Sequence, residues 1–94
     1  MWSMFEGAST FNQNIGNWDT SSVEYMTSMF ERASTFNQNI GGWDTSSVIS
    51  MWFMFDGASA FTNQDLSGWS VANVTEHTAF MTGAGSGNTE PSWP

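Results

Sequence analysis

Two acidic turns carry the residues whose types and spacing could do chemistry. Asp19 and Asp44 each begin an Asp-Thr-Ser-Ser run, and the two runs lie 25 residues apart. Calcium is bound by about six to eight oxygens, usually with several carboxylates close together. Each turn supplies one carboxylate, so the capping of a helix N-terminus explains the same residues more simply. A weakly bound cation between Asp19 and Asp44 stays open as an alternative.

Other candidate chemistry is sparse. His77 is the only histidine and the chain has no cysteine, so a zinc site or a nucleophile–base pair is not expected. The methionine and phenylalanine columns fall at helical spacing, which indicates core packing and not a soft-metal or ligand pocket. The sequence therefore predicts no catalytic residue, no metal site and no cofactor.

Charge narrows the range of partners. Arg32 is the only Lys or Arg against nine Asp and Glu, and the formal net charge is −8. Binding to nucleic acid or to an anionic membrane surface would require basic residues that the chain lacks. No apolar run approaches the length of a membrane span. We expect neither nucleic-acid binding nor membrane insertion.

A 25-residue repeat organises the chain. The stretch FNQNIGNWDTSSVEYM (11–26) returns as FNQNIGGWDTSSVISM (36–51), and a looser third copy carries one extra residue, assigned to Thr62. Such a period is typical of stacked repeat architectures. The predicted organisation is a solenoid over 1–84 with a degenerate C-terminal cap or tail. The units are 1–25, 26–50, 51–76 and 77–84, with the cap or tail at 85–94.

Each unit is predicted to contain a helix followed by a short strand. Val48, Met51, Met54, Phe55 and Ala58 follow helical periodicity after a possible cap at Asp44. The predicted helices lie near 1–8, 22–33, 47–58 and 73–84, and the predicted strands lie near 11–15, 36–40 and 62–66. Stacking would give an α/β repeat, a short leucine-rich-repeat-like solenoid with parallel strands. Two columns, Phe11/Phe36/Phe61 and Trp18/Trp43/Trp69, would form aromatic ladders, and the Asn12 and Asn37 amides would bond backbone groups between coils.

The repeat resembles that of the BspA-type leucine-rich-repeat surface proteins, whose units are close to MFxGAxxFNQDIxxWDTSxVxxM. The matching stretches are MFEGASTFNQNIGNWDTSSVEYM (4–26), MFERASTFNQNIGGWDTSSVISM (29–51) and, less closely, MFDGASAFTNQDLSGWSVANVTEH (54–77). The resemblance implies a non-enzymatic protein, extracellular or on the cell surface, that acts in adhesion or partner binding. It implies no catalytic residue and no cofactor.

The positions where the repeat changes are candidates for function. Trp2 and Trp52-Phe53 stand where the second unit has Thr27-Ser28. They lie off the predicted buried stripe, so they are candidate partner contacts, with packing on a neighbouring helix as the alternative. Pro91 and Trp93 in the tail are further candidates, as a guard of the last strand edge and a cover of the last core layer.

These features give a leading function and two others. The leading function is an interaction module for a protein partner or for copies of itself, including filaments. Carbohydrate binding is the alternative, through exposed Trp and a column of Gln13, Gln38 and Gln64. A glycosidase would need two facing carboxylates, and the sequence singles out no such pair.

Overall fold

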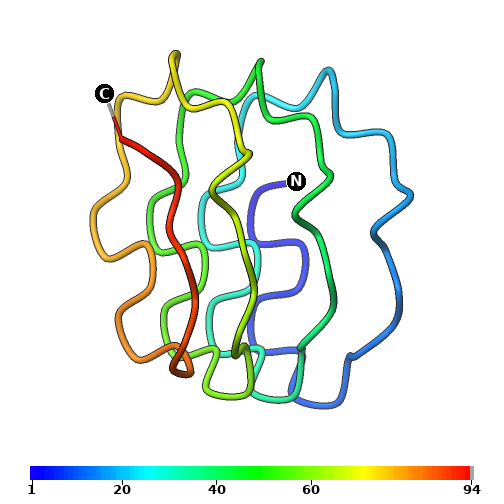
Figure 1. Cartoon of the computed structure of the whole chain (residues 1–94). Coiled ribbons are helices and arrows are strands. Elements are labelled where there is room, and N and C mark those ends of the chain that lie inside the picture. Colours follow the sequence, from blue (N-terminus) through cyan, green and yellow to red (C-terminus); the bar gives the residue numbers. More distant parts are fainter. Residues whose placement is uncertain (94) are drawn as a thin grey trace.

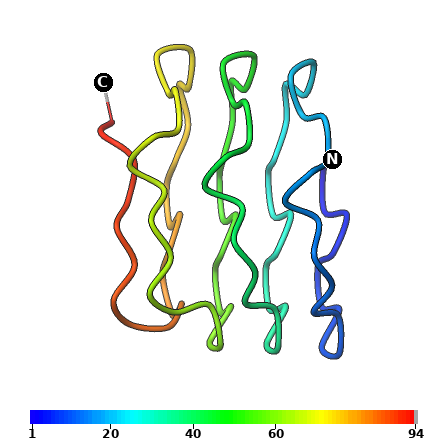
Figure 2. The same ribbon diagram turned by 45° about the vertical axis from the view of Figure 1, so that its right-hand side comes forward.

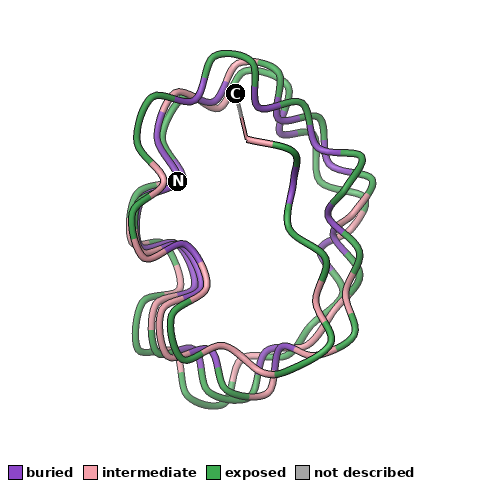
Figure 3. Ribbon diagram, turned by 60° about the vertical axis from the view of Figure 1, so that its left-hand side comes forward, coloured by how far each residue is buried: buried purple, intermediate pink, exposed green. Residues whose placement is uncertain are grey.

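The chain winds through successive coils that stack on one another. The structure is a computed structural model, and it describes residues 1–93. Figures 1 and 2 show the coils side by side, and Figure 3, turned toward the stacking axis, shows them nearly superimposed. Hydrogen bonds between residues 23 to 29 positions apart join neighbouring coils, as the bond from Ser28 N–H to the Trp52 carbonyl oxygen illustrates (2.8 Å). The repeat in the sequence is therefore a repeat in space.

The predicted helices are wrong. Residues 1–93 contain no helix, and their only β-pairing consists of isolated parallel bridges. The bridges join Tyr25 to Ser50, Ser50 to Glu76, and Asp65 to Thr89. The α/β architecture, a leucine-rich-repeat-like solenoid with a helix and a strand in each coil, is thereby overturned. The segments predicted as helices are chains of tight turns.

Two consecutive turns replace each predicted helix. The Met26 carbonyl accepts from Met29 N–H at 3.3 Å, and the Phe30 carbonyl accepts from Ala33 N–H at 3.0 Å. The third residue of each turn has a positive φ, as in a type II turn. These left-handed positions form two columns: Ser3, Ser28, Phe53 and Ala79, and Gly7, Arg32, Gly57 and Gly83. A left-handed residue at these points interrupts an α-helix.

The turns leave alternate N–H groups free to bond the next coil. Ser28, Phe30 and Arg32 donate to carbonyl oxygens 24 residues ahead, at 2.8, 2.8 and 2.7 Å. In an α-helix the same donors would bond oxygens four residues behind them. The apolar spacing i, i+3, i+4, i+7 fits both structures, because two back-to-back four-residue turns also point their first and last residues to one side. The backbone donors thus stabilise the stack instead of a helix.

The Asp-Thr-Ser-Ser segments are corners, not helix caps. Asp44 Oδ1 accepts from Ser46 N–H at 3.0 Å and from the Ser46 hydroxyl at 2.6 Å, and Asp19 does the same with Ser21. This is an Asx turn, the same local bonding that an N-cap uses, without a following helix. The Thr45 side chain is buried, and its hydroxyl donates to the Ser70 carbonyl in the next coil.

The predicted strands are also wrong, but the predicted amide bonding is confirmed. Asn12 Oδ1 accepts from Asn37 N–H at 2.9 Å, and Asn37 Oδ1 accepts from Thr62 N–H at 3.1 Å. Thr62 therefore continues the asparagine column. The extra residue of the third unit is Asn63, whose φ of 57° marks a local bulge, and not Thr62. Side-chain amides replace strand ladders along this segment.

The core is a set of stacked aromatic columns. Phe36 lies 5.8 Å from Phe11 and 6.0 Å from Phe61, ring centroid to ring centroid, with nearly parallel planes. The Trp43 and Trp69 rings are 6.3 Å apart and 6° from parallel. The phenylalanine ladder is confirmed, and so is this step of the tryptophan ladder. Offset parallel rings contribute both apolar burial and favourable quadrupole geometry.

The last described residues run along the third coil. Leu66 N–H donates to the Thr89 carbonyl at 2.9 Å, and Thr89 N–H donates to the Gln64 carbonyl at 2.9 Å. Trp93 packs edge-on against Phe80, at 4.9 Å between ring centroids. Of the predicted cap or tail at 85–94, Pro94 lies outside the described residues. The proposed unit boundaries remain a prediction.

Candidate functional site

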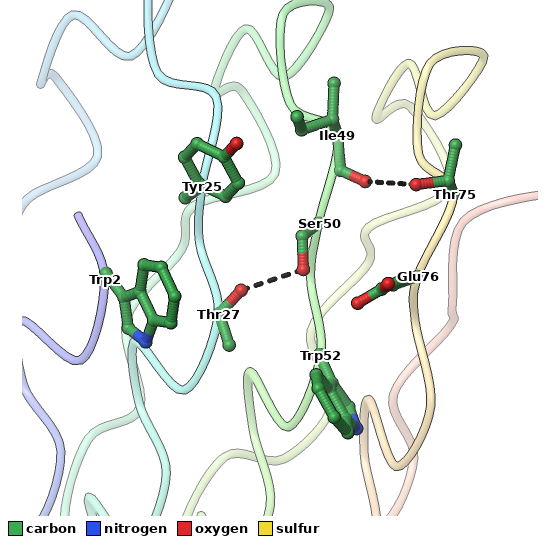
Figure 4. Close-up of a pocket in the computed structure, with 8 residues that line it drawn as sticks. All are labelled: Trp2, Tyr25, Thr27, Ile49, Ser50, Trp52, Thr75 and Glu76. Atoms are coloured by element: carbon green, nitrogen blue, oxygen red, sulfur yellow. Dashed lines mark hydrogen bonds between the residues drawn. The ribbon is translucent and has the colours of Figure 1, made fainter.

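A groove opens on the outside of the stack, across neighbouring coils. It has a volume of about 280 Å³ and is lined by aromatic, hydroxyl and carboxylate side chains (Figure 4). The lining residues are Trp2, Tyr25, Thr27, Ile49, Ser50, Trp52, Thr75 and Glu76. The repeat explains the hollow, because a small side chain, Thr27, stands in the column between two large ones, Trp2 and Trp52.

One wall of the groove is an aromatic pair. The Trp2 and Tyr25 rings stack with centroids 5.8 Å apart and planes 27° from parallel. Trp2 is 66 % exposed and Tyr25 42 % exposed, so the pair presents ring faces and edges to solvent. The Met1 amino group donates to the Tyr25 carbonyl at 3.1 Å, which ties the first coil to the second beside this wall.

A second aromatic wall comes from the third unit. Trp52 is 41 % exposed and stacks on Phe53, with ring centroids 5.2 Å apart. Phe53 is half-buried and holds a left-handed φ of 58°. Phe53 therefore supports the indole from behind, and Trp52 presents its surface to the groove.

The floor is polar but internally bonded. The Thr27 and Ser50 hydroxyls share a hydrogen bond of 2.8 Å, and both side chains are buried. Figure 4 shows this bond at the centre, with Trp2 and Tyr25 on one side and Glu76 on the other. The parallel bridge from Ser50 to Glu76 fixes the Glu76 backbone at the far edge. A ligand in the groove would meet a floor whose hydroxyls already have partners.

The groove carries one carboxylate and lies on a molecule of negative net charge. Glu76 is exposed and is the only ionisable carboxylate among the lining residues. The only Lys or Arg of the chain, Arg32, is bound to Glu6 at 3.0 Å, and Arg32 is not part of the groove. With a net charge of −8, the molecule attracts cations toward this surface.

The structure gathers some of the predicted contact residues and separates others. Trp2 and Trp52 line the same groove, and Phe53 packs behind Trp52. Pro91 is buried, and Trp93 stacks on His77 with ring centroids 4.0 Å apart. Pro91 and Trp93 thus belong to the packing of the C-terminal segment and lie outside the groove.

The predicted glycan column has other bonding partners. Gln38 Nε2 donates to Asn12 Oδ1 at 3.0 Å, and Gln64 Nε2 donates to Asn37 Oδ1 at 2.9 Å. Gln13, in the first unit, is exposed. The amide donors of Gln38 and Gln64 therefore take part in the bonding between coils, on a segment that does not line the groove.

The aspartate corners contain no built cation site. Within residues 1–93, no group of three or more His, Cys, Asp and Glu side chains is placed to share a metal ion. The hydroxyl and N–H of Ser46 lower the pKa of Asp44, and repulsion from Asp19 raises it to a smaller extent. The Ser21 hydroxyl and N–H likewise lower the pKa of Asp19. Serine donors thus already stabilise both carboxylates.

Six lining residues were not predicted from the sequence: Tyr25, Thr27, Ile49, Ser50, Thr75 and Glu76. In an extended segment, residues two apart point to the same side, so Tyr25 and Thr27 share a face, and so do Ser50 and Trp52. The assumed helix placed these pairs on different faces. The usable signal was the aromatic Tyr25, two positions before the Trp/Thr column that contains Trp2, Thr27 and Trp52.

The family described as "Mycoplasma protein of unknown function, DUF285" matches residues 1–93. The chain belongs to this family. No curated protein and no solved structure matches the chain. The DUF285 match covers nearly the whole repeat array. Within its described residues, this DUF285 chain has no helix long and apolar enough to cross a membrane.

Proposed function

We propose that this DUF285 chain is a non-enzymatic interaction module that holds a protein partner in the groove between Trp2 and Trp52. The observation that carries the proposal is the placement of these two exposed indoles, 50 residues apart in sequence, in one groove with Tyr25. The few residues that carry most of the binding energy of a protein interface are enriched in tryptophan and tyrosine. A cluster of such side chains on an otherwise polar surface is a typical contact site.

A surface location fits the same proposal. The repeat resembles that of BspA-type leucine-rich-repeat surface proteins, which implies an extracellular or cell-surface module acting in adhesion, partner binding or self-assembly. The turn-built coils place changeable side chains on a constant frame. Adhesion through such a surface requires no catalytic group. The single carboxylate in the groove, Glu76, also falls short of the pair that a glycosidase uses.

A peptide library displayed on phage and selected on the immobilised protein tests the proposal. The competing protein in the selection is a W2T/W52T double variant, chosen because Thr27 and Thr78 occupy the same column of the repeat. We expect the selected peptides to lose binding to this variant and to keep binding to Gln13→Ala, which changes another exposed face.

The outcome also separates the alternatives. Peptides that bind wild type and W2T/W52T equally would contradict a role for the groove. Binding of a glycan array by wild type, lost in W2T/W52T and without any peptide binders, would replace the protein partner by a carbohydrate. Concentration-dependent mass in light scattering, abolished by the double variant, would instead assign the groove to self-assembly.

A further inference from the structure

We infer that the Trp2–Trp52 groove binds a basic side chain, Lys or Arg, of a partner protein other than a second copy of this chain. The inference deepens the proposed function and rests on it. It names the chemistry of the group that enters the groove.

Aromatic faces next to a carboxylate favour a cation. Trp2, Tyr25 and Trp52 are each at least 41 % exposed and lie on the two aromatic sides of the groove. A guanidinium or ammonium group over an indole face is attracted by the ring quadrupole. Glu76 at the opposite edge can complete the site with a charge-assisted hydrogen bond.

The floor argues against a polyhydroxyl ligand. Proteins hold sugars by hydrogen bonds as well as by ring stacking. A sugar site therefore needs protein donors and acceptors that have no other partner. Here Thr27 and Ser50 are 8 % and 7 % exposed and bond each other at 2.8 Å. The Thr75 hydroxyl donates to the Ile49 carbonyl at 3.3 Å. The serine and threonine hydroxyls of the groove are therefore engaged, and Glu76 supplies its charged acceptor.

Charge also decides between a foreign partner and a second copy. A copy of this chain could offer only Arg32 as a Lys or Arg, and Arg32 is paired with Glu6 at 3.0 Å. Two copies with a charge of −8 each repel one another over the distance on which encounter is steered. The same negative charge attracts a basic partner protein.

Indole N–H resonances provide the test, because the six tryptophans report separately. The intact chain, labelled with ¹⁵N, is titrated with Ac-Gly-Arg-Gly-NH2, with Ac-Gly-Lys-Gly-NH2, and with the citrulline peptide, which replaces the guanidinium by a neutral near-isostere. W2T and W52T assign the two resonances. We expect the basic peptides to shift Trp2 and Trp52 selectively, with dissociation constants at least fivefold lower than that of the citrulline peptide.

Two variants test whether the affinity for the arginine peptide depends on the Glu76 carboxylate itself or only on the net charge of the molecule. Glu76→Gln and Glu90→Gln remove the same charge, but Glu90 lies outside the groove and bonds Trp93 Nε1. We expect Glu76→Gln to weaken the arginine peptide about threefold to tenfold, and Glu90→Gln to leave its affinity unchanged. Equal weakening by both variants would overturn the role of Glu76.

The titration distinguishes a failure of the cation hypothesis from a failure of the groove as a binding site. Equal shifts from the arginine and citrulline peptides would overturn the cation and retain the groove as a binding site. Shifts of Trp2 and Trp52 by maltotriose or N-acetylglucosamine, but by no peptide, would assign a sugar. No shift at millimolar concentration of any probe would contradict both the cation and the proposed function of the groove.

Discussion

Trp43 Nε1 donates a hydrogen bond of 3.0 Å to the Ile15 carbonyl oxygen in the preceding coil. Trp69 repeats the contact with the Ile40 carbonyl, also at 3.0 Å. Each indole thus fills the core with its ring and joins two coils with its polar edge, which is how a buried tryptophan usually satisfies its N–H. Within residues 1–93, the Trp18 indole has no such acceptor.

Replacement of Trp43 by benzothienylalanine removes the N–H and keeps the ring shape. We expect the free energy of unfolding to fall by about 1 kcal/mol, the net value of one intramolecular hydrogen bond. The same replacement at Trp18 should change it by less than half as much. Urea denaturation measures both, and equal losses at the two positions would contradict the bond between coils.

Glycine substitutions distinguish the turns from the helices that the periodicity predicted. Gly57 has φ +73°, so Gly57→Ala should cost about 1–2 kcal/mol. Arg32 holds the equivalent left-handed position, and Arg32→Gly should be neutral or stabilising, since its exposed ion pair with Glu6 contributes little. A helix would reverse both signs, because alanine stabilises a helix interior relative to glycine by about 1 kcal/mol. Thermal unfolding of the two variants decides between turns and helices.

Close stacking of the coils makes adjacent glycines unequal. A Cβ on Gly41 would lie 2.6 Å from the Asp65 carbonyl oxygen, whereas a Cβ on Gly42 would meet nothing within 4 Å. Gly41→Ala should therefore destabilise the protein by about 1–3 kcal/mol through overpacking against backbone. Gly42→Ala is the matched control and should change stability by under about 0.5 kcal/mol. Comparable losses would show that the coils are not packed in this register.

The aspartate corners predict a direction of pH dependence. Serine donors lower the pKa of Asp44 below its ordinary value of 3.8. The folded state therefore holds this proton less tightly than the unfolded state, and the stabilisation present above the ordinary pKa is lost as the pH falls through the lowered value. Ser46→Ala should raise the pKa of Asp44, measured by NMR titration of its carboxyl carbon.

Ser47→Ala is the control for that titration. The Ser47 hydroxyl donates to the Ser21 carbonyl at 2.7 Å and not to Asp44. The Ser47→Ala substitution should leave the pKa of Asp44 unchanged. An unchanged pKa in Ser46→Ala would show that the Asx turn does not stabilise the carboxylate.

The sequence predicted the repeat, its register apart from the extra residue of the third unit, and much of the core, because each depends on residue identity at a fixed period. Phe11, Phe36 and Phe61 stack as their 25-residue spacing required. It did not predict the secondary structure. The spacing of Met51, Met54, Phe55 and Ala58 is shared by a helix and by two successive turns, and only the left-handed residues distinguish them. Gly7 and Gly57 carried that signal, but Phe53 and Arg32 concealed it.

The sequence predicted only some of the residues that line the groove. Trp2 and Trp52 differ from the threonine that the second unit has at this position of the repeat. This difference indicated exposed contact residues, and both line the groove. Tyr25 and Glu76 were missed because an assumed helix pointed them elsewhere. Side-chain direction depends on backbone conformation, so the error in secondary structure became an error in the composition of the site.

The role of the groove as a binding surface is tested most directly by the affinity of Trp52→Thr for the tightest peptide from the library selection, measured by isothermal titration calorimetry. Threonine is the residue that the repeat itself places in this column at Thr27. We expect a dissociation constant at least tenfold higher than that of wild type, with an unchanged urea midpoint showing that the fold is retained. An unchanged dissociation constant would contradict the groove as the binding surface.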